Sequence, residues 1–412
     1  MAGDGMEVEE QKAPAASTPA PVPALEEEEE VPEEKKVPDM ALAQRCWVAV
    51  SHGDKEAAAD VMAAVREHSM APWFSHLTQH HPEVFPPDDA LLAEMRAANV
   101  KEAERLDKAI EEAEADSGDM EVLDAHFAKA RLWATTGAKE EAENAYGAIT
   151  DRPKMSTGRR IDAVMELIRV ALFHMDKPQV REGLDRAKKL IEQGGDWDRR
   201  NRLKVYEALY LISARDISGA AALLLECVAT FTCVELCSYE DFIFYTVVTN
   251  VLSIPRTTLK KKIIDGPEVL AVIVDIPNVS QLVNSLHACD YSKFMHAMVE
   301  VNSQLQLDRY FAPHTRHLVR ELRILAYTQF LDAYKSVILS SMATAFGVGE
   351  DFLDKELSRF IAAGRLNAKI DKVGGVVETN RPDKKNAQYQ SAIKQGDLLL
   401  NRVQKLARVM DS

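Results

Sequence analysis

The sequence predicts a mainly α-helical protein, in which a solenoid of tetratricopeptide-like helical repeats runs into a winged helix and ends in one further helix. Three observations support this fold class. Helical reversals recur near Gly137, Asp176 and Asp216, at a spacing of about forty residues. A pattern of two helices and a hairpin follows within residues 341–380. Apolar residues then repeat with heptad spacing up to the C-terminus.

Size and composition are those of a globular protein with a charged N-terminal segment. The 412 residues leave room for two or three domains, and 46% of them are hydrophobic. Of the net charge of −15, most comes from residues 1–39, which hold twelve acidic and three basic residues and no aromatic ones. A segment of this composition buries too little apolar surface to offset its ordering entropy. We expect residues 1–39 to form a disordered acidic tail.

The sequence also bears on the protein's environment. No signal-peptide pattern opens the chain, and no run of about eighteen uncharged apolar residues occurs in it. The five cysteines are odd in number and lie in apolar sequence that reads as helix. These features predict a soluble intracellular protein with reduced thiols.

The domains follow in chain order. Residues 40–119 read as an N-terminal helical extension, in which the charged stretch 101–114 is typical of a solvent-facing helix. Residues 120–237 read as the repeats, since Gly137, Ala142 and Tyr146 give the small and aromatic pattern by which paired helices approach closely. Each helical hairpin buries its apolar stripe only by stacking on the next, and such arrays bind proteins.

Residues 238–380 form the predicted third domain. Its helices are interrupted at prolines, and one long helix is expected from Leu318 to Ser340, leading directly into the winged helix. There, Ser341 is expected to cap the first helix, and Gly364 to end the second. Leu366, Ala368 and Ile370 then alternate with polar residues, and a Gly-Gly turn leads to the return strand.

Charge argues against nucleic acid as the ligand of this winged helix. Between Glu350 and Phe360, the candidate recognition helix holds four acidic and two basic residues, so the phosphates of a duplex would repel it. The sequence therefore favours a protein-binding module. A nucleic-acid-binding winged helix remains an alternative, motivated by the fold and by the basic run Lys260–Lys262.

Residues 386–412 are predicted to form the C-terminal helix. One face carries an apolar seam over about three heptads, formed by Tyr389, Ala392, Gly396, Leu399, Val403, Leu406 and Met410. A seam of this kind needs a partner, either helices of other subunits or the protein's own domain.

Short motifs extend the pattern to a known family. They include RELRILAYTQFLDAY from Arg320, ELSRFIAAGRL from Glu356, VETNRPD from Val377 and GDLLLNRVQKLARV from Gly396. Together with the architecture, these stretches resemble the PCI family of scaffold subunits, which occur in the proteasome lid, the signalosome and a translation-initiation complex. Within that family they are most similar to lid members.

The resemblance implies a role and a set of contacts. It implies a non-catalytic scaffold of the proteasome regulatory-particle lid, acting in ubiquitin-dependent protein degradation in the cytoplasm and nucleus. Its partners would be other PCI-domain lid subunits and the lid deubiquitinase pair, with no nucleic acid, membrane, small-molecule substrate or cofactor. The winged-helix PCI module would join its neighbours edge to edge, and the last helix would enter a shared bundle. The implied contact residues are Lys369, Ile370, Val376 and Val377 in the hairpin and Ile393, Leu399, Val403 and Leu406 in the last helix. A signalosome-type PCI scaffold is the alternative within the family.

The sequence predicts no catalytic residue. A zinc-dependent deubiquitinase needs an H-x-H pair, which is lacking, and the grouped His76, His80 and His81 make only a weak metal candidate. Cys233 and Cys237 have the spacing of one helical face, but they are interpreted as structural thiols. No phosphate-binding G-x-x-x-x-G-K-[ST] occurs. The sequence thus predicts no catalytic residue, no metal site and no cofactor.

Overall fold

The computed structural model describes residues 36–116, 118–153, 155–380 and 384–410, and it confirms a mainly helical fold with one small sheet. Residues 1–35 of the predicted acidic tail lie outside the described residues. In the described part of the chain, no helix combines the length and the apolar content needed to cross a membrane.

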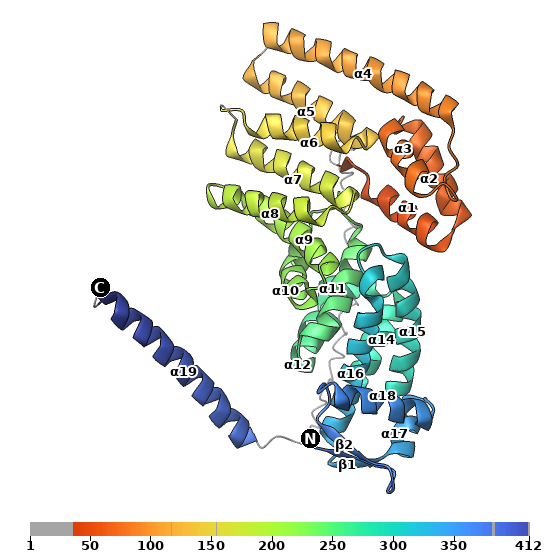
Figure 1. Cartoon of the computed structure of the whole chain (residues 1–412), viewed down its shortest axis with the longest axis vertical. Helices are drawn as coiled ribbons and strands as arrows, with labels where there is room; N and C mark the ends of the chain where they lie inside the picture. The colour runs from red at the N-terminus through yellow and green to blue at the C-terminus, as the bar shows by residue number, and fades with distance from the viewer. Residues whose placement is uncertain (1–35, 117, 154, 381–383, 411–412) are drawn as a thin grey trace, which may run out of the picture.

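Four helices precede the repeats: α1 Met40–His52, α2 Lys55–Glu67, α3 Ala71–His80 and α4 Asp89–Asp116. Aspartates begin the first two, because the side chain of Asp39 accepts a hydrogen bond from the Ala41 amide and that of Asp54 accepts one from Glu56. Figure 1 shows α4 as the outermost helix of the stack, with α1 to α3 beside the following repeats.

Three helical hairpins form the repeats: α5 Asp119–Thr136 with α6 Lys139–Thr150, α7 Thr157–Phe173 with α8 Lys177–Glu192, and α9 Trp197–Ser213 with α10 Ile217–Cys227. The three predicted reversals are confirmed. Gly137 ends α5 in the left-handed conformation at φ +75°, while Asp176 and Asp216 cap the N-termini of α8 and α10. The hairpins stack in chain order along the long axis of the molecule (Figure 1).

The next segment is also helical and contains the elements η2 Val228–Thr230, α11 Tyr239–Ser253, α12 Arg256–Leu259, η3 Lys260–Ile264, α13 Pro267–Ile273, α14 Pro277–Ala288, α15 Tyr291–Leu307, η4 Ala312–His314 and α16 Thr315–Ala333. Pro267 and Pro277 stand in the first turns of α13 and α14, where their missing N–H groups cost nothing. Cys233 and Cys237 have the spacing of one helical face, but both lie in the loop between η2 and α11 and in no helix.

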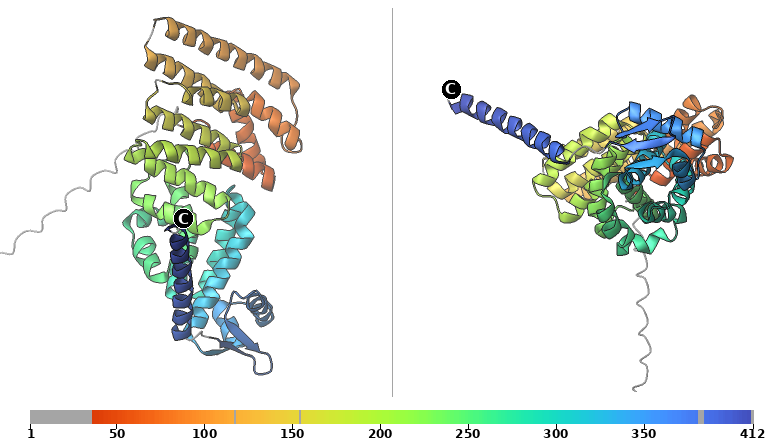
Figure 2. Two further views of the ribbon diagram at one scale, coloured as in Figure 1. Left: turned by 60° about the vertical axis from the view of Figure 1, so that its left-hand side comes forward. Right: turned by 90° about the horizontal axis from the view of Figure 1, so that it is seen from below.

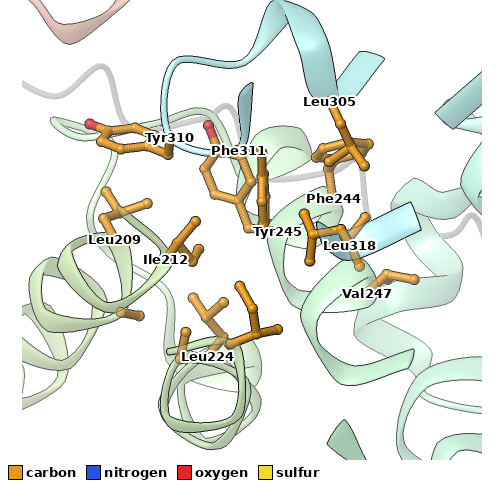
Figure 3. Close-up of a cluster of buried hydrophobic side chains, with 14 of the residues drawn as sticks. Leu209, Ile212, Leu224, Phe244, Tyr245, Val247, Leu305, Tyr310, Phe311 and Leu318 are labelled. Atoms are coloured by element: carbon orange, nitrogen blue, oxygen red, sulfur yellow. The ribbon is translucent and has the colours of Figure 1, made fainter. Parts of the chain in front are cut away.

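A continuous core joins the repeats to this segment. Figure 3 shows Leu209 and Ile212 of α9 facing a group of aromatic side chains that includes Tyr245 of α11 and Phe311. The Tyr245 ring lies edge-on to Phe311, with 5.6 Å between the ring centroids. The second and third hairpins therefore share one hydrophobic core with the following helices, whereas the first hairpin packs around Phe127 and Tyr146 in a second cluster.

The winged helix completes the body with β1 Ser336–Ile338, α17 Leu339–Phe346, α18 Glu350–Ala362, β2 Ala368–Asp371 and β3 Val376–Thr379. Its sheet is antiparallel with strand order β1-β3-β2. Two predictions are wrong here. The helix expected to reach Ser340 ends at Ala333, because residues 336–338 pair with β3, and Ser341 caps nothing, because α17 begins directly after the strand at Leu339.

Two buried ion pairs share one sequence spacing. In each, an arginine precedes a tyrosine by four residues, and a glutamate 29 residues beyond the tyrosine accepts a hydrogen bond from the tyrosine and forms an ion pair with the arginine. The two sets are Arg202, Tyr206 and Glu235 in the repeats and Arg323, Tyr327 and Glu356 in the winged helix. The Tyr–Glu distances are 3.1 Å and 2.7 Å. Buried carboxylates with two donors each fix the packing of the helices around them.

The last helix, α19 Lys384–Met410, stands apart from this body. Figures 1 and 2 show it projecting from the winged-helix end into open space. All of its described side chains are exposed. In the described part of the chain, no other element covers α19.

Candidate protein-interaction sites

The hairpin of β2 and β3, here called the wing, presents two different faces. In register, Ile370 and Val377 stand opposite each other, and both pack on the core, Val377 with no exposed surface. Lys369 pairs with Glu378 across the strands, and both side chains are exposed. Of the four implied contact residues in the wing, the structure therefore turns Lys369 and the half-buried Val376 outward and Ile370 and Val377 inward.

The outer face of the sheet gains a residue that the sequence did not predict. Ile338 of β1 stands beside Val376 in the register, and its side chain is 58% exposed. At the tip of the wing, Val373 is fully exposed, held by a turn in which Asp371 accepts hydrogen bonds from the amides of Val373 and Gly374. An apolar strip thus crosses the outside of the wing, next to two open sheet edges.

Charges on α18 agree with a protein-binding role. Two of the four acidic residues of α18 are engaged within the protein. Glu356 is buried and forms an ion pair with Arg323, and Asp354 forms an ion pair of 3.1 Å with Lys372 of the wing. The exposed charges that remain on the helix are Glu350 and Asp351 in its first turn and Lys355 and Arg359 further along. These charges balance, so the helix lacks the excess of cations that would favour phosphate groups.

Three of the implied contact residues of α19 lie together on one face. Leu399, Val403 and Leu406 recur at i, i+4 and i+7 and form an apolar stripe along the helix, while Ile393 lies at the edge of that stripe, about 120° around the helix from Leu399. Each of the four is more than half exposed. No core cluster of the described residues includes a residue of α19. The structure does not place this stripe against the protein's own domain.

The surroundings of the candidate histidines and cysteines do not suggest metal binding or catalysis. His76 and His80 stack at 4.1 Å on α3, and no group of three potential ligands in the described chain could hold a metal ion. Burial raises the pKa of the Cys46 and Cys227 thiols to about 11, and it also raises the pKa of Cys233 well above its usual value. These three thiols stay protonated at neutral pH, and a protonated thiol is a poor nucleophile.

Lys260, Lys261 and Lys262, which motivated the nucleic-acid alternative, lie exposed on the single π-helical turn η3. The nearby Arg256 is engaged with the carbonyl of His287. A second group of cations lies on α16 and comprises Arg316, Arg320 and Arg323. It is largely neutralised, because Arg323 pairs with Glu356 and Arg320 lies 3.6 Å from Glu321.

The sequence reasoning missed a joint between the repeats and the segment that follows α15. Arg309, after α15, is buried, and its guanidinium donates to the carbonyls of Leu172 and Phe173 at the end of α7. Its neighbour Asp308 accepts a hydrogen bond from Tyr245 at 2.6 Å. The only signal in the sequence was an Asp-Arg pair after a helix, which is common and unspecific.

Comparison with known proteins gives three family matches along the chain. Residues 88–262 match the model described as 26S proteasome subunit RPN7, and residues 298–381 match the PCI domain. Residues 388–410, within α19, match the C-terminal helix of 26S proteasome regulatory subunit RPN7/PSMD6. The PCI prediction is confirmed.

Whole-chain relatives agree with these matches. The chain is 46% identical to 26S proteasome non-ATPase regulatory subunit 6 of Oryza sativa subsp. japonica, over 92% of this chain and 98% of the relative. It is 48% identical to the homolog of that subunit in Arabidopsis thaliana, over 85% and 90%. COP9 signalosome complex subunit 1 of Arabidopsis thaliana is 28% identical over only 40% of this chain. The chain belongs to the family of 26S proteasome non-ATPase regulatory subunit 6, or RPN7.

Proposed function

We propose that this protein is a non-catalytic structural subunit of the proteasome regulatory-particle lid, where it scaffolds lid assembly for ubiquitin-dependent protein degradation. One observation carries the proposal. A helix of 27 residues projects from the body with its apolar stripe uncovered, and the same helix matches a family model of its own. An apolar stripe of this length on a soluble protein is a docking face, since water does not favour its exposure.

The wing and α19 contact different parts of the neighbouring subunits. The wing joins neighbouring PCI domains edge to edge through its outer face, where Lys369, Val376 and Ile338 are accessible. Ile370 and Val377 support that face from inside. In α19, the contact residues Ile393, Leu399, Val403 and Leu406 enter a bundle of helices from other subunits.

The proposal extends to domains, partners and location. Residues 40–119 form the N-terminal extension, 120–237 the repeats, 238–380 the PCI domain and 386–412 the bundling helix. The partners are the other PCI-domain lid subunits and the lid deubiquitinase pair, in the cytoplasm and the nucleus. The relatives are named non-ATPase regulatory subunits, which supports a role without ATP hydrolysis, and the proposed role needs no catalysis, cofactor or metal.

The test compares the tagged full-length chain with a chain that ends at Pro382, each isolated from cell extract and examined by native gel and mass spectrometry. Co-purification of the lid with the full-length chain, and its loss on truncation, is the expected result. Migration of both chains alone would overturn the proposal. Co-purification with the signalosome would replace it by the alternative scaffold within the same family.

A further inference from the structure

The helix α19 has a second face that the bundle does not use. At 100° per residue, the apolar stripe of Tyr389, Ile393, Leu399, Val403, Leu406 and Met410 fills one side. The opposite side carries Lys394, Leu398, Arg402, Lys405 and Val409, here called the basic face. The helix as a whole holds six basic residues and one acidic residue, Asp397.

This basic face differs from a helix face that is merely solvated. The exposed helix α4 of the same chain mixes both signs, and its Arg105 pairs with Glu102 one turn away. On α19, by contrast, Arg402 and Lys405 are neighbours at i, i+3 with no acidic residue one turn from either, so they repel each other. Between them and Lys394 lies Leu398, 60% exposed, which solvation alone does not favour.

We propose that the basic face of α19 binds an acidic protein surface within the same assembly, so that the helix is covered on two opposite sides. This inference rests on the proposed function and names the chemistry of a second partner surface. Asp397 lies one turn from Lys394, but Arg402 and Lys405 have no acidic neighbour on the helix, and these two uncompensated cations are complementary to carboxylates. Leu398 gives that contact an apolar centre with charged groups around it.

The composition of α19 favours a protein over a membrane or a nucleic acid. Its apolar stripe includes Ala392, Gly396 and Ala407, small residues that allow helix backbones to approach closely. The helix contains no Trp or Phe, the residues that anchor amphipathic helices in a lipid interface. The stripe therefore suits helix packing, and a basic face on such a helix is directed toward neighbouring protein.

A photoreactive benzoylphenylalanine tests the two faces separately. It is placed in the full-length chain in cells either at Leu398, on the basic face, or at Leu399, on the apolar stripe. Both positions are expected to crosslink to subunits of the same complex, at different surfaces, and the Leu398 product is expected to map to a segment rich in Asp and Glu. A crosslink from Leu399 but not from Leu398 would overturn the inference, as would a crosslink from Leu398 to lipid or nucleic acid.

Charge reversal supplies a second test. The triple variant K394E, R402E and K405E is expected to enter the lid at least tenfold less than the wild type. The matched control K55E, K101E and K108E makes the same charge change at exposed lysines of α2 and α4, and it is expected to stay within twofold. Normal entry of the basic-face variant would overturn the inference alone, whereas absence of the wild-type chain from the lid would overturn the proposed function and the inference together.

Discussion

The backbone N–H of Arg309 donates a hydrogen bond of 3.1 Å to the side-chain oxygen of Gln44, although the two residues lie 265 positions apart. The amide nitrogen of Gln44 in turn donates to the carbonyl of Leu307 at 2.7 Å. One glutamine of α1 thus satisfies both a donor and an acceptor in the segment between α15 and α16. These two hydrogen bonds connect α1 directly to the chain around the end of α15.

The variant Arg309→Met should loosen the neighbouring contact between this segment and α7. It removes the buried guanidinium that donates to two carbonyls at the end of α7; the Leu172 carbonyl still accepts a hydrogen bond from the Met175 amide, whereas that of Phe173 loses its side-chain donor. We expect the free energy of unfolding to fall by about 2–4 kcal/mol. Urea denaturation gives that value, and hydrogen exchange should show the end of α7 losing protection first. Arg66→Met, at an exposed site of α2, is the control, and equal effects of the two variants would contradict the joint.

The variant Glu235→Gln should destabilise the repeats strongly. The Glu235 carboxylate is buried and accepts hydrogen bonds from Arg202 at 2.5 Å and from Tyr206, so its neutralisation leaves a buried cation unpaired. We expect a loss of about 3 kcal/mol in urea denaturation. Glu226→Gln breaks an exposed pair with Lys204 and should cost less than about 0.5 kcal/mol. The double variant Arg202→Met with Glu235→Met should recover most of the stability, and failure to recover would mean that shape, not charge, decides this site.

Stability should fall on mild acidification, partly because of His174. Burial and the nearby Lys139 lower the pKa of His174 from 6.5 to about 4 in the folded chain. Between about pH 4 and pH 6.5, His174 therefore binds a proton in the unfolded chain but not in the folded chain. The contribution of His174 is present above about pH 6.5, is lost progressively toward pH 4, and amounts to at most about 3 kcal/mol. His174→Gln should flatten the dependence of unfolding free energy on pH, while His52→Gln, at an exposed site, should leave the slope as it is.

The wing should be sensitive to a single methyl group at Gly375. This residue has φ +62°, and its carbonyl accepts a 2.8 Å hydrogen bond from the Leu339 amide at the start of α17. Gly375→Ala should cost about 1–2 kcal/mol, because a Cβ is strained in the left-handed region. Gly349→Ala is the control, since its φ is −70° and a Cβ there meets nothing within 4 Å. Thermal unfolding of both variants is the measurement, and equal melting temperatures would count against the strain argument.

The apolar stripe of α19 should matter for assembly but not for folding. Replacing Leu399, Val403 and Leu406 by Ala should leave the melting temperature of the isolated chain unchanged, because these exposed side chains contact no core cluster of the described residues. Entry into the lid, measured by native gel, should fall at least tenfold. The control variant changes three polar residues of the same helix, Gln390, Asn401 and Gln404, to Ala. Loss of entry in both variants would point to the helix as such rather than to its stripe.

Helix spacing made much of the fold predictable. The turns at Gly137, Asp176 and Asp216 depend on local chemistry, a left-handed glycine and two side-chain caps, and local chemistry is visible in sequence. The strand β1 depends on something else. Ser336–Ile338 is extended because β3, about forty residues later, offers it hydrogen bonds, and residues continuing a strong helical pattern gave no sign of that partner.

The candidate sites divide in the same way. Alternation placed Ile370 and Val377 in strands, but only the register shows that they share the inner face, while Ile338 and Val376 share the outer one. The stripe on α19 could be predicted, because helical periodicity alone decides which residues share a face of an isolated helix. The contact of Gln44 with Arg309 could not, since no periodic signal links the two segments.

The exposure of α19 has a consequence for the cell's supply of this protein. A copy without partners displays a stripe of large apolar side chains that an incorporated copy would hide, and exposed stripes of that kind promote aggregation and attract chaperones and proteases. Copies made in excess of their partners should therefore be recognised through this exposed stripe and degraded. The abundance of the protein should then follow that of its partners rather than its own rate of synthesis.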